Sequence, residues 1–384
     1  MHVSTDRILT THVGSLPRSA AVTEMVYAEE NDRPIDHRRF DAVIAEAVRD
    51  AIARQRKSGV DVVSDGEMSK ISYATYIRHR LTGFAGDSPR RVPQDLEAYP
   101  NYLGRAAKGG TTPTYRRPRC VGPIAVKTLD PLHVDIATMK AALAGSGATE
   151  GFMNSASPGV IALFQPDEHY GDHRKYLEAI GNAMQAEYEA IAASGLLIQI
   201  DSPDLALGRH MMFKGRGEAE FLAMAELHVE VLNHALRNVP RDSVRLHICW
   251  GNYEGPHHCD IDLEKILPIV VKARARAISF EGANPRHAHE WRAFTRTKIP
   301  DDLVLMPGVL DSTSNFIEHP ELVAERIERF AAIVGRERVI ASSDCGFSTF
   351  AGFGVVDPDI VYAKLEALAQ GAAIASARLW GRPD

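Results

Sequence analysis

The chain has 384 residues, of which 45% are hydrophobic and 24% are charged. This composition can bury a large core, and it excludes a chain that is mainly disordered, collagen-like or coiled-coil. Lys and Arg number 44 against 50 Asp and Glu, so the net charge is −6 and no overall positive charge attracts nucleic acid. We therefore expect a globular protein that binds small molecules.

The sequence shows no signal for membrane insertion or secretion. Its longest stretch without a charged residue, Gly151 to Pro166, is too short and too polar to span a bilayer. Asp6 and Arg7 precede any apolar stretch, unlike in a signal peptide. Four cysteines are too few for a disulfide framework, and in a reducing compartment they are more often buried, catalytic or metal-bound. We expect a cytoplasmic protein with no membrane or nucleic-acid partner, and the sequence leaves a homo-oligomer open.

Short apolar runs bounded by turn residues alternate with amphipathic stretches, as in the βα units of a parallel sheet. The eight predicted strands are Arg7–Val13, Val60–Ser64, Arg119–Val126, Leu196–Ile200, Val244–Trp250, Ala277–Phe280, Leu303–Gly308 and Arg338–Ser342. Apolar positions that repeat near every three to four residues predict helices over Asp41–Lys57, Tyr176–Ala193, Glu218–Arg237, Leu263–Ala273, Glu321–Ile333 and Asp359–Ala375. This alternation predicts an α/β fold, a single (β/α)8 TIM barrel over residues 1–384.

Two stretches fit this scheme poorly, and we predict long loop insertions at about residues 84–118 and 127–170. The first is rich in Lys and Arg and is interleaved with Tyr99, Tyr102 and Tyr115. Such a segment could bind an anion as a lid over the site, or it could be a solvated surface insertion. The composition alone favours the surface insertion.

Reactive residue types follow the predicted strands, at the end where a TIM barrel carries its active site. They are His12, Gly14, Ser15, Asp65, Glu67, Asp201, His247, Cys249, Glu281, Asp311, Asp344 and Cys345. Any one carboxylate at a strand end is at least as often a helix cap or a loop hydrogen bond as a catalytic group. Their recurrence around the ring favours an active site at this face.

A metal site is predicted among these residues. His247 and Cys249 are two residues apart on one predicted strand, so their side chains share a face. Glu281 and Cys345 end two other strands and can converge on the same point. One nitrogen, two sulfurs and one oxygen suit Zn²⁺ in a tetrahedron. Without the other two residues, a His-x-Cys pair is more often a buried cysteine beside a histidine whose hydrogen bonds are already made within the protein.

Other cysteines and histidines are weaker candidates. His257, His258 and Cys259 are adjacent in a loop and could bind a metal, although their sequence is more typical of a turn and a helix entry. Cys120 lies in an apolar run and is expected in the core. The sequence has no phosphate-binding loop, no dinucleotide fingerprint and no nucleophile elbow.

Seven short motifs occur in a family's order along nearly the whole chain. They are Val-Gly-Ser-Leu-Pro-Arg (13–18), Gly-Glu (66–67), Gln-Ile-Asp (199–201), His-Ile-Cys (247–249), Phe-Glu (280–281), Pro-Gly-Val (307–309) and Asp-Cys-Gly (344–346). With them the chain resembles the catalytic barrel of the cobalamin-independent methionine synthase family, in its single-barrel form. The segments 246–251 and 280–291 are further similar to epoxyalkane:coenzyme M transferase, a branch of this family that opens epoxides with a zinc-bound thiol.

The resemblance implies how a zinc site would be built. The zinc ligands would be His247, Cys249, Glu281 and Cys345. A free thiol has a pKa of roughly 8.5 and a coordinated thiol is deprotonated, so zinc would make a thiolate nucleophile available at neutral pH.

The resemblance also implies how the substrates would be held. Gly14 and Ser15 would lie near the carboxylate of a homocysteine-like thiol, and Glu67 and Asp201 near its ammonium group. Glu67, Asp201 and Asp311 are the expected catalytic carboxylates. The expected partners are a small-molecule thiol and an alkyl donor, for which methyltetrahydrofolate is a candidate.

Two departures from the family pattern bear on the donor. Methionine synthases end the seventh strand in Asp-x-His, whereas this chain has Asp311-Ser312-Thr313, and their Lys-Thr-Arg after the last Cys is Ser348-Thr349-Phe350 here. Another acid, such as His12, His287 or His289, would then protonate the leaving group.

We therefore expect a zinc-dependent thiol S-alkyltransferase, with methyl transfer to a homocysteine-type thiolate to give methionine. Ring opening of an epoxide by a coenzyme M-like thiolate is the alternative reaction. A zinc-stabilised binding or regulatory barrel is the alternative outside the enzyme class.

Overall fold

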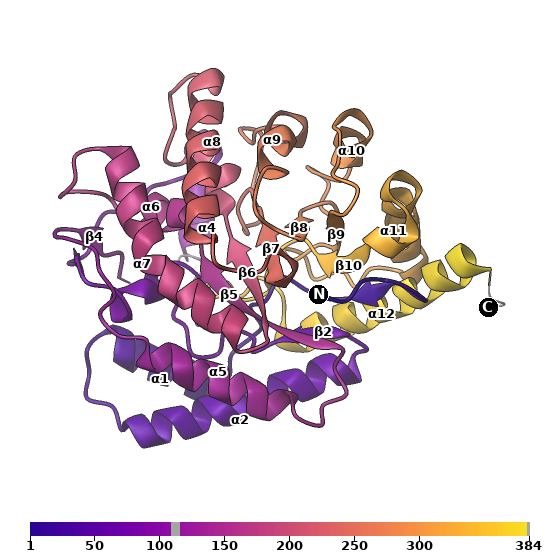
Figure 1. Cartoon of the computed structure of the whole chain (residues 1–384), viewed down its shortest axis with the longest axis horizontal. Helices are drawn as coiled ribbons and strands as arrows, with labels where there is room; N and C mark the ends of the chain where they lie inside the picture. Colours follow the sequence, from indigo (N-terminus) through magenta and orange to yellow (C-terminus); the bar gives the residue numbers. More distant parts are fainter. Residues whose placement is uncertain (109–115, 382–384) are drawn as a thin grey trace.

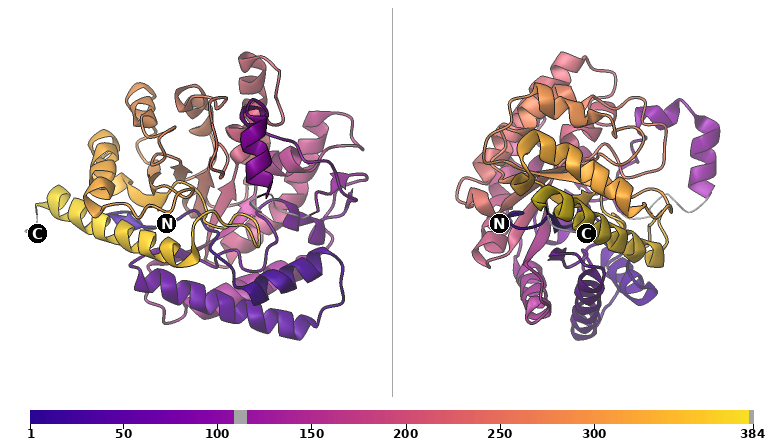
Figure 2. Two further views of the ribbon diagram at one scale, coloured as in Figure 1. Left: turned by 180° about the vertical axis from the view of Figure 1, so that it is seen from behind. Right: turned by 90° about the vertical axis from the view of Figure 1, so that its right-hand side faces the viewer.

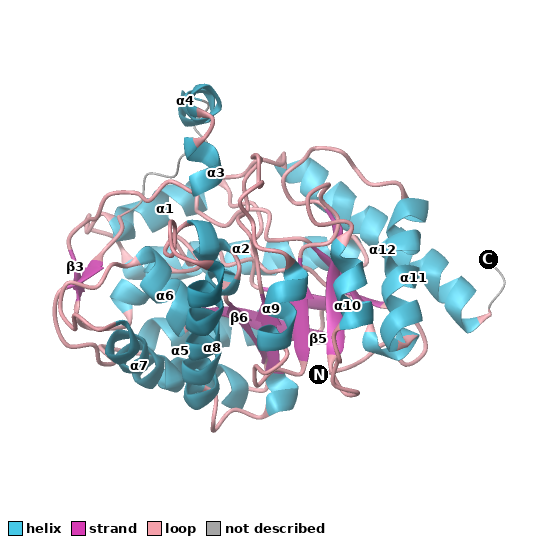
Figure 3. Cartoon of the chain, turned by 90° about the horizontal axis from the view of Figure 1, so that it is seen from above, coloured by secondary structure: helices cyan, strands magenta, loops and turns pink. Residues whose placement is uncertain are grey.

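The computed structural model describes residues 1–108 and 116–381. Eight parallel strands form the central sheet, ringed by helices (Figure 3), in the spatial order β1 (Leu9–Thr10), β10 (Ile340–Ser343), β9 (Val304–Leu310), β8 (Ala277–Phe280), β7 (Val244–His247), β6 (Leu197–Asp201), β5 (Glu150–Ala156) and β2 (Val62–Ser64). The two edge strands meet, because Asp61 N–H donates to the Thr10 carbonyl at 3.1 Å. The sheet is a nearly closed barrel, so the predicted TIM-barrel fold is confirmed.

Helices cover the outside of this barrel (Figures 1 and 2). They are α1 (Ala20–Glu30), α2 (His37–Lys57), α5 (Asp130–Leu143), α6 (Pro158–Phe164), α7 (His173–Ala193), α8 (Glu218–Ala235), α9 (Leu263–Val270), α10 (Ala293–Arg296), α11 (Pro320–Val334) and α12 (Pro358–Trp380). Asp36, Asp172 and Asp357 cap α2, α7 and α12 by accepting backbone N–H groups of the first turn. The six predicted helices correspond to α2, α7, α8, α9, α11 and α12. None of the helices in the described part is both long and apolar enough to cross a bilayer.

One predicted strand is wrong. Of Arg119–Val126 only Arg119–Cys120 (β4) is a strand, and it pairs antiparallel with β3 (Phe84–Ala85) outside the barrel. The third barrel strand is β5, inside the stretch that we expected to be the second insertion. Gly, Asn and Ser interrupt the apolar run of β5, and nearly all its side chains are buried, so the alternation that marks a half-exposed strand is absent.

The first insertion adds β3, β4, α3 (Gln94–Glu97) and α4 (Pro100–Lys108), and α4 stands away from the ring of helices (Figure 3). Asp95 of α3 is buried and accepts hydrogen bonds from the Tyr253 hydroxyl at 2.8 Å and from His257 N–H at 2.9 Å. The Tyr102 hydroxyl of α4 donates to the Glu254 carbonyl. The insertion is thus docked on the loop that follows β7. Tyr115 lies outside the described residues.

Candidate active site

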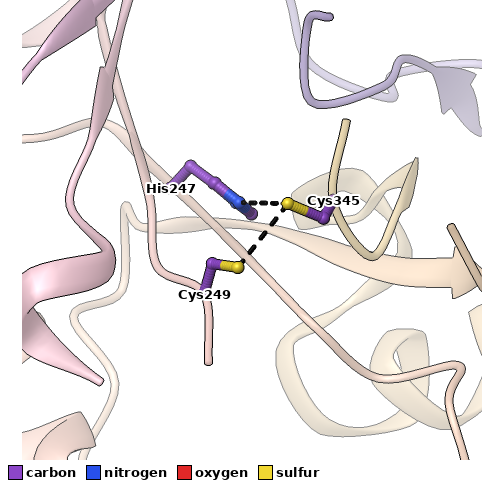
Figure 4. Close-up of side chains that lie close together, drawn as sticks. All are labelled: His247, Cys249 and Cys345. Carbon is purple, nitrogen blue, oxygen red and sulfur yellow. Dashed lines mark hydrogen bonds between the residues drawn. The ribbon is translucent and has the colours of Figure 1, made fainter. Parts of the chain in front are cut away.

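Three metal-donor side chains meet at the carboxyl ends of β7 and β10 (Figure 4). His247 ends β7, Cys249 follows two residues later, and Cys345 follows β10. Cys345 Sγ lies 3.5 Å from Cys249 Sγ and 3.7 Å from His247 Nε2, and the three donor atoms are all within 4.8 Å of one another. His247 Nδ1 is 3.3 Å from Ser279 Oγ, which orients the ring with Nε2 toward the sulfurs. One imidazole nitrogen and two thiols therefore face a common point.

Glu281 lies beside this trio. Its Oε1 accepts from Trp250 N–H at 2.8 Å and its Oε2 accepts from the Asn284 side chain at 2.7 Å. Burial and the neighbouring Cys249 raise its pKa well above the usual range. Asp344 accepts the three successive backbone N–H groups after Glu281 at 2.7 to 2.8 Å, which fixes the loop that carries this carboxylate. Three of the four expected ligands are together, and the fourth is adjacent to them.

The protonation of the trio is set by burial. Burial and the charge of Arg245 lower the pKa of His247 to about 3, so the ring is neutral, which is the form that binds metal. The hydrogen bond with Cys345 and burial hold the pKa of Cys249 well above that of a free thiol. The pKa of Cys345 is raised as well, so both thiols are protonated in the metal-free protein, and a bound cation would reverse this.

A cavity of about 490 Å³ opens over the trio. Its size lies within the range of roughly 300 to 1,000 Å³ that is typical of small-molecule sites. The walls are mostly apolar and include Val13, Phe164, Leu207 and Phe350. Such a wall excludes water and strengthens the electrostatic interactions inside the cavity.

Glu67 and Asp201 line this cavity and are buried. Asp201 accepts from Asn154 Nδ2 and Gln199 Nε2, both at 2.9 Å, whereas Glu67 Oε2 has no hydrogen-bond partner. Glu67 also has a φ of 57°, in the left-handed region that residues other than glycine rarely adopt. Burial raises the pKa of Glu67 to about 7 and that of Asp201 to about 6. The pair therefore holds a proton close to neutral pH.

Asn154 on β5 completes this part of the site, and the sequence did not point to it. Its Nδ2 donates to Asp201 and to the Val13 carbonyl, both at 2.9 Å, and its buried Oδ1 has no partner. Gly14 packs against it with a φ of 138°, and a Cβ at Gly14 would lie 2.2 Å from Asn154 Oδ1. Ser15 lines the cavity itself. Asn154 was missed because its strand was not recognised.

Several expected groups do not line the cavity. Asp311 Oδ1 accepts from the N–H and hydroxyl of Thr313 at 2.9 and 2.8 Å, so this carboxylate closes its own turn. His12 Nε2 is 2.7 Å from Gln55 Oε1, and burial lowers the His12 pKa to about 4. His287 and His289 also lie outside the lining. Glu67 and Asp201, rather than a histidine, are the cavity acids whose pKa values lie near neutral pH.

Four arginines of the first insertion form a basic wall of the same cavity, namely Arg90, Arg91, Arg105 and Arg117. The structure records no ion pair between Arg91, Arg105 or Arg117 and a carboxylate of the described residues. Burial and the charge of Arg117 lower the pKa of Arg91, and the buried Arg117 Nε has no hydrogen-bond partner. These features favour the anion-binding lid over a plain surface insertion.

Residues 8–100 and 160–357 match the model of the family described as cobalamin-independent synthase, catalytic domain. The chain belongs to this family. A 2-hydroxypropyl-CoM lyase of Xanthobacter autotrophicus is 26% identical over 376 residues, which cover 88% of each chain. A methionine synthase of Saccharolobus solfataricus is 24% identical over 369 residues, which cover 94% of this chain and 93% of the relative. The resemblance seen in the motifs is confirmed, and the chain is an enzyme of the methionine synthase-like family.

A solved structure of the same family shares the fold. It is the B12-independent methionine synthase of Shewanella sp. W3-18-1 in complex with selenomethionine. The TM-score is 0.73 at 18% identity, and the alignment covers 98% of this chain and 99% of that one. The two chains therefore share the barrel fold over nearly all of their length.

Proposed function

We propose that the chain is a zinc-dependent thiol S-alkyltransferase that methylates a homocysteine-type thiol to methionine, as one catalytic domain working in the cytoplasm. The convergence of His247, Cys249 and Cys345 under a cavity carries this proposal. A neutral imidazole and two thiols, with the Glu281 carboxylate adjacent, fit the nitrogen, sulfur and oxygen donors that zinc prefers. When bound, zinc would lower the pKa of the substrate thiol and make the thiolate available at neutral pH.

The carboxylate pair fits the ammonium group of an amino-acid thiol. A buried carboxylate without a partner is costly, and Glu67 Oε2 has none in the structure. An ammonium group placed between Glu67 and Asp201 would offset this cost and displace the proton that the pair holds. Ser15 lies on the same wall, where its hydroxyl can meet the substrate carboxylate. These residues would orient the sulfur toward the trio.

The basic wall fits an alkyl donor with an anionic end, such as methyltetrahydrofolate. Transfer from a tertiary amine also requires a proton on the leaving nitrogen. An ammonium group bound between Glu67 and Asp201 would keep both carboxylates ionised, so we do not assign this proton to Glu67. His12, His287 and His289 stay the candidates for the acid, although they lie outside the cavity lining, as does Asp311.

Epoxide opening by a coenzyme M-like thiolate is the second candidate. It is favoured by the similarity to 2-hydroxypropyl-CoM lyase. The basic wall would then bind the sulfonate of the thiol. A non-catalytic zinc barrel is the least supported hypothesis, because a structural zinc site is closed, whereas His247, Cys249 and Cys345 face an open cavity.

Product analysis tests these candidates. Zinc-loaded protein is incubated with homocysteine or 2-mercaptoethanesulfonate, each with methyltetrahydrofolate or epoxypropane, and the products are identified by mass spectrometry. We expect methionine from homocysteine and the methyl donor. Alkylation of mercaptoethanesulfonate alone would favour the second candidate, and no alkylated thiol in any combination would contradict both.

A further inference from the structure

A second cluster of metal-donor side chains lies outside the cavity. It joins the loop after β7 to the loop after β8. His257 Nδ1 and His287 Nε2 are each 3.0 Å from the same oxygen, Asp260 Oδ2. The three donor atoms lie within 4.8 Å of one another. None of these residues lines the cavity above the cysteine pair, so the cluster is separate from the candidate active site.

The outer nitrogen of each ring shows which way the ring is protonated. His257 Nε2 is 3.0 Å from the Tyr253 carbonyl, and His287 Nδ1 is 2.7 Å from Glu290 Oε2. Both partners only accept, so these two nitrogens carry hydrogens. In the metal-free protein the hydrogen bonds to Asp260 outweigh burial and raise the pKa of His257 and that of His287, the latter to about 10, so each inner nitrogen holds a proton that it donates to Asp260. The two inner nitrogens and the Asp260 oxygen converge on one point, where a cation that displaces these protons would meet two nitrogen lone pairs and one carboxylate oxygen.

This arrangement matches the surroundings of metal-bound histidine. A histidine ligand usually donates its other ring N–H to a backbone carbonyl or a carboxylate, which fixes the tautomer. His257 does the first and His287 does the second. Glu290 is itself held, because its Oε1 accepts from Leu263 N–H at 2.7 Å. The two rings are thus anchored from outside, with their inner nitrogens aimed at one point.

His210 supplies an independent observation. It is fully buried, and neither of its ring nitrogens has a hydrogen-bond partner. Its Nε2 lies 3.0 Å from Asp260 Oδ1, which also lacks a hydrogen-bond donor. The contact has the distance of an ion pair but not the geometry of a hydrogen bond, so neither atom has a hydrogen-bond partner. A cation held by Asp260 would satisfy this oxygen, and His210 is the nearest further nitrogen donor.

The charge around the cluster is also suited to a cation that takes the place of the histidine protons. Asp95, Asp260 and Glu290 are three buried carboxylates, and their ion pairs in the described residues are made with histidine only. The protons on His257 and His287 supply two positive charges to this pocket in the metal-free protein. A divalent ion places two positive charges at the point where the donor atoms meet.

We propose that His257, Asp260 and His287 form a second metal site, which takes a divalent transition metal of the zinc class. Two imidazoles and one carboxylate suit such an ion better than Mg²⁺ or Ca²⁺, which prefer oxygen ligands alone. The ion would tie the loop that carries Cys249 and Tyr253 to the loop that carries Glu281. This role is structural, and it does not depend on the reaction proposed above.

The test counts metal in a protein whose first site has been removed. The double variant Cys249→Ser/Cys345→Ser is loaded with Zn²⁺ or Co²⁺, dialysed, and analysed by elemental mass spectrometry and by visible absorption. We expect about one ion per chain, and a Co²⁺ spectrum without the sulfur-to-metal band of a thiolate site. Adding Asp260→Asn and His287→Gln should abolish this binding. His258→Gln is the matched control, because His258 is the exposed neighbour of His257, and it should leave the metal content unchanged.

Circular dichroism confirms that each variant is folded before its metal is counted. A folded double cysteine variant that takes up no metal would overturn the proposal. Imidazole ¹⁵N shifts of the metal-free protein would then report whether His257 and His287 are both doubly protonated, so that protons fill the cluster. This test does not depend on the metal site below the cavity, because it counts the metal bound by a protein that lacks both cysteines of that site.

Discussion

Replacing Glu67 by Gln should make the protein more stable at alkaline pH. Glu67 is buried beside Asp201 with one oxygen unpartnered, and its pKa is raised from 4.5 to about 7. Between these two pH values the folded protein keeps a proton that the unfolded chain has lost. The folded state then binds more protons than the unfolded state, so the free energy of unfolding falls as the pH rises through this window.

The size of this effect follows from the same values. One pKa unit corresponds to about 1.4 kcal/mol, so a rise from 4.5 to about 7 destabilises the ionised wild type on the order of 3 kcal/mol at pH 8. Gln has nearly the same shape and cannot ionise. The Glu67→Gln variant should therefore match the wild type near pH 4.5 and exceed its stability by roughly 2 to 3 kcal/mol at pH 8.

Urea denaturation at pH 5, 6, 7 and 8, on metal-free protein, measures the difference. Glu46→Gln, at an exposed position of α2, is the control and should show no such pH dependence. A stability difference between Glu67→Gln and wild type that does not change with pH would show that Glu67 ionises as an exposed carboxylate does, and would contradict this prediction. The same variant should bind homocysteine more weakly, since it removes one of the two charges that face the ammonium group.

Three further substitutions test the cavity walls. Gly14→Ala places a Cβ 2.2 Å from the Asn154 amide oxygen at a φ of 138°, so it should lower the free energy of unfolding by roughly 1 to 3 kcal/mol, as measured by thermal denaturation. The control Gly217→Ala, with open space around it, should lower it much less. Asp201→Asn should raise the Kd of homocysteine, measured by calorimetry, roughly ten- to hundredfold and leave the Kd of a thiol without an amine unchanged. An equal loss of affinity for both thiols would assign Asp201 a structural role. Arg117→Gln should raise the KM of an anionic donor about tenfold, whereas Arg116→Gln, outside the cavity lining, should leave it unchanged. Equal KM values for Arg117→Gln and wild type would show that the insertion is a surface element without a role in donor binding.

The sequence predicted the barrel because most of its strands and helices have a clear period. The helices with buried stripes, such as α2 and α11, begin and end within a few residues of the prediction. β5 was missed because a strand buried on both faces loses its alternation, and Asn154 was missed with it. The second insertion was predicted in place of this strand.

The site was predictable where local geometry decides it. His247 and Cys249 share a strand face by their spacing alone, and Cys345 follows from the convergence of strand ends in a barrel. Asp311 did not follow this rule, because a carboxylate at a strand end can instead close its own turn. The cluster of His257, Asp260 and His287 forms only where two loops meet, and the hydrophobic period of a sequence does not predict how loops meet.

In the proposed reaction, zinc at His247, Cys249 and Cys345 takes the sulfur of the substrate as a ligand. X-ray absorption at the zinc edge tests it directly, on zinc-loaded protein carrying Asp260→Asn and His287→Gln so that only this site contributes. We expect a shell with two sulfurs and one or more lighter atoms, and one additional sulfur after homocysteine is added. A zinc shell without sulfur, or one that homocysteine leaves unchanged, would contradict it.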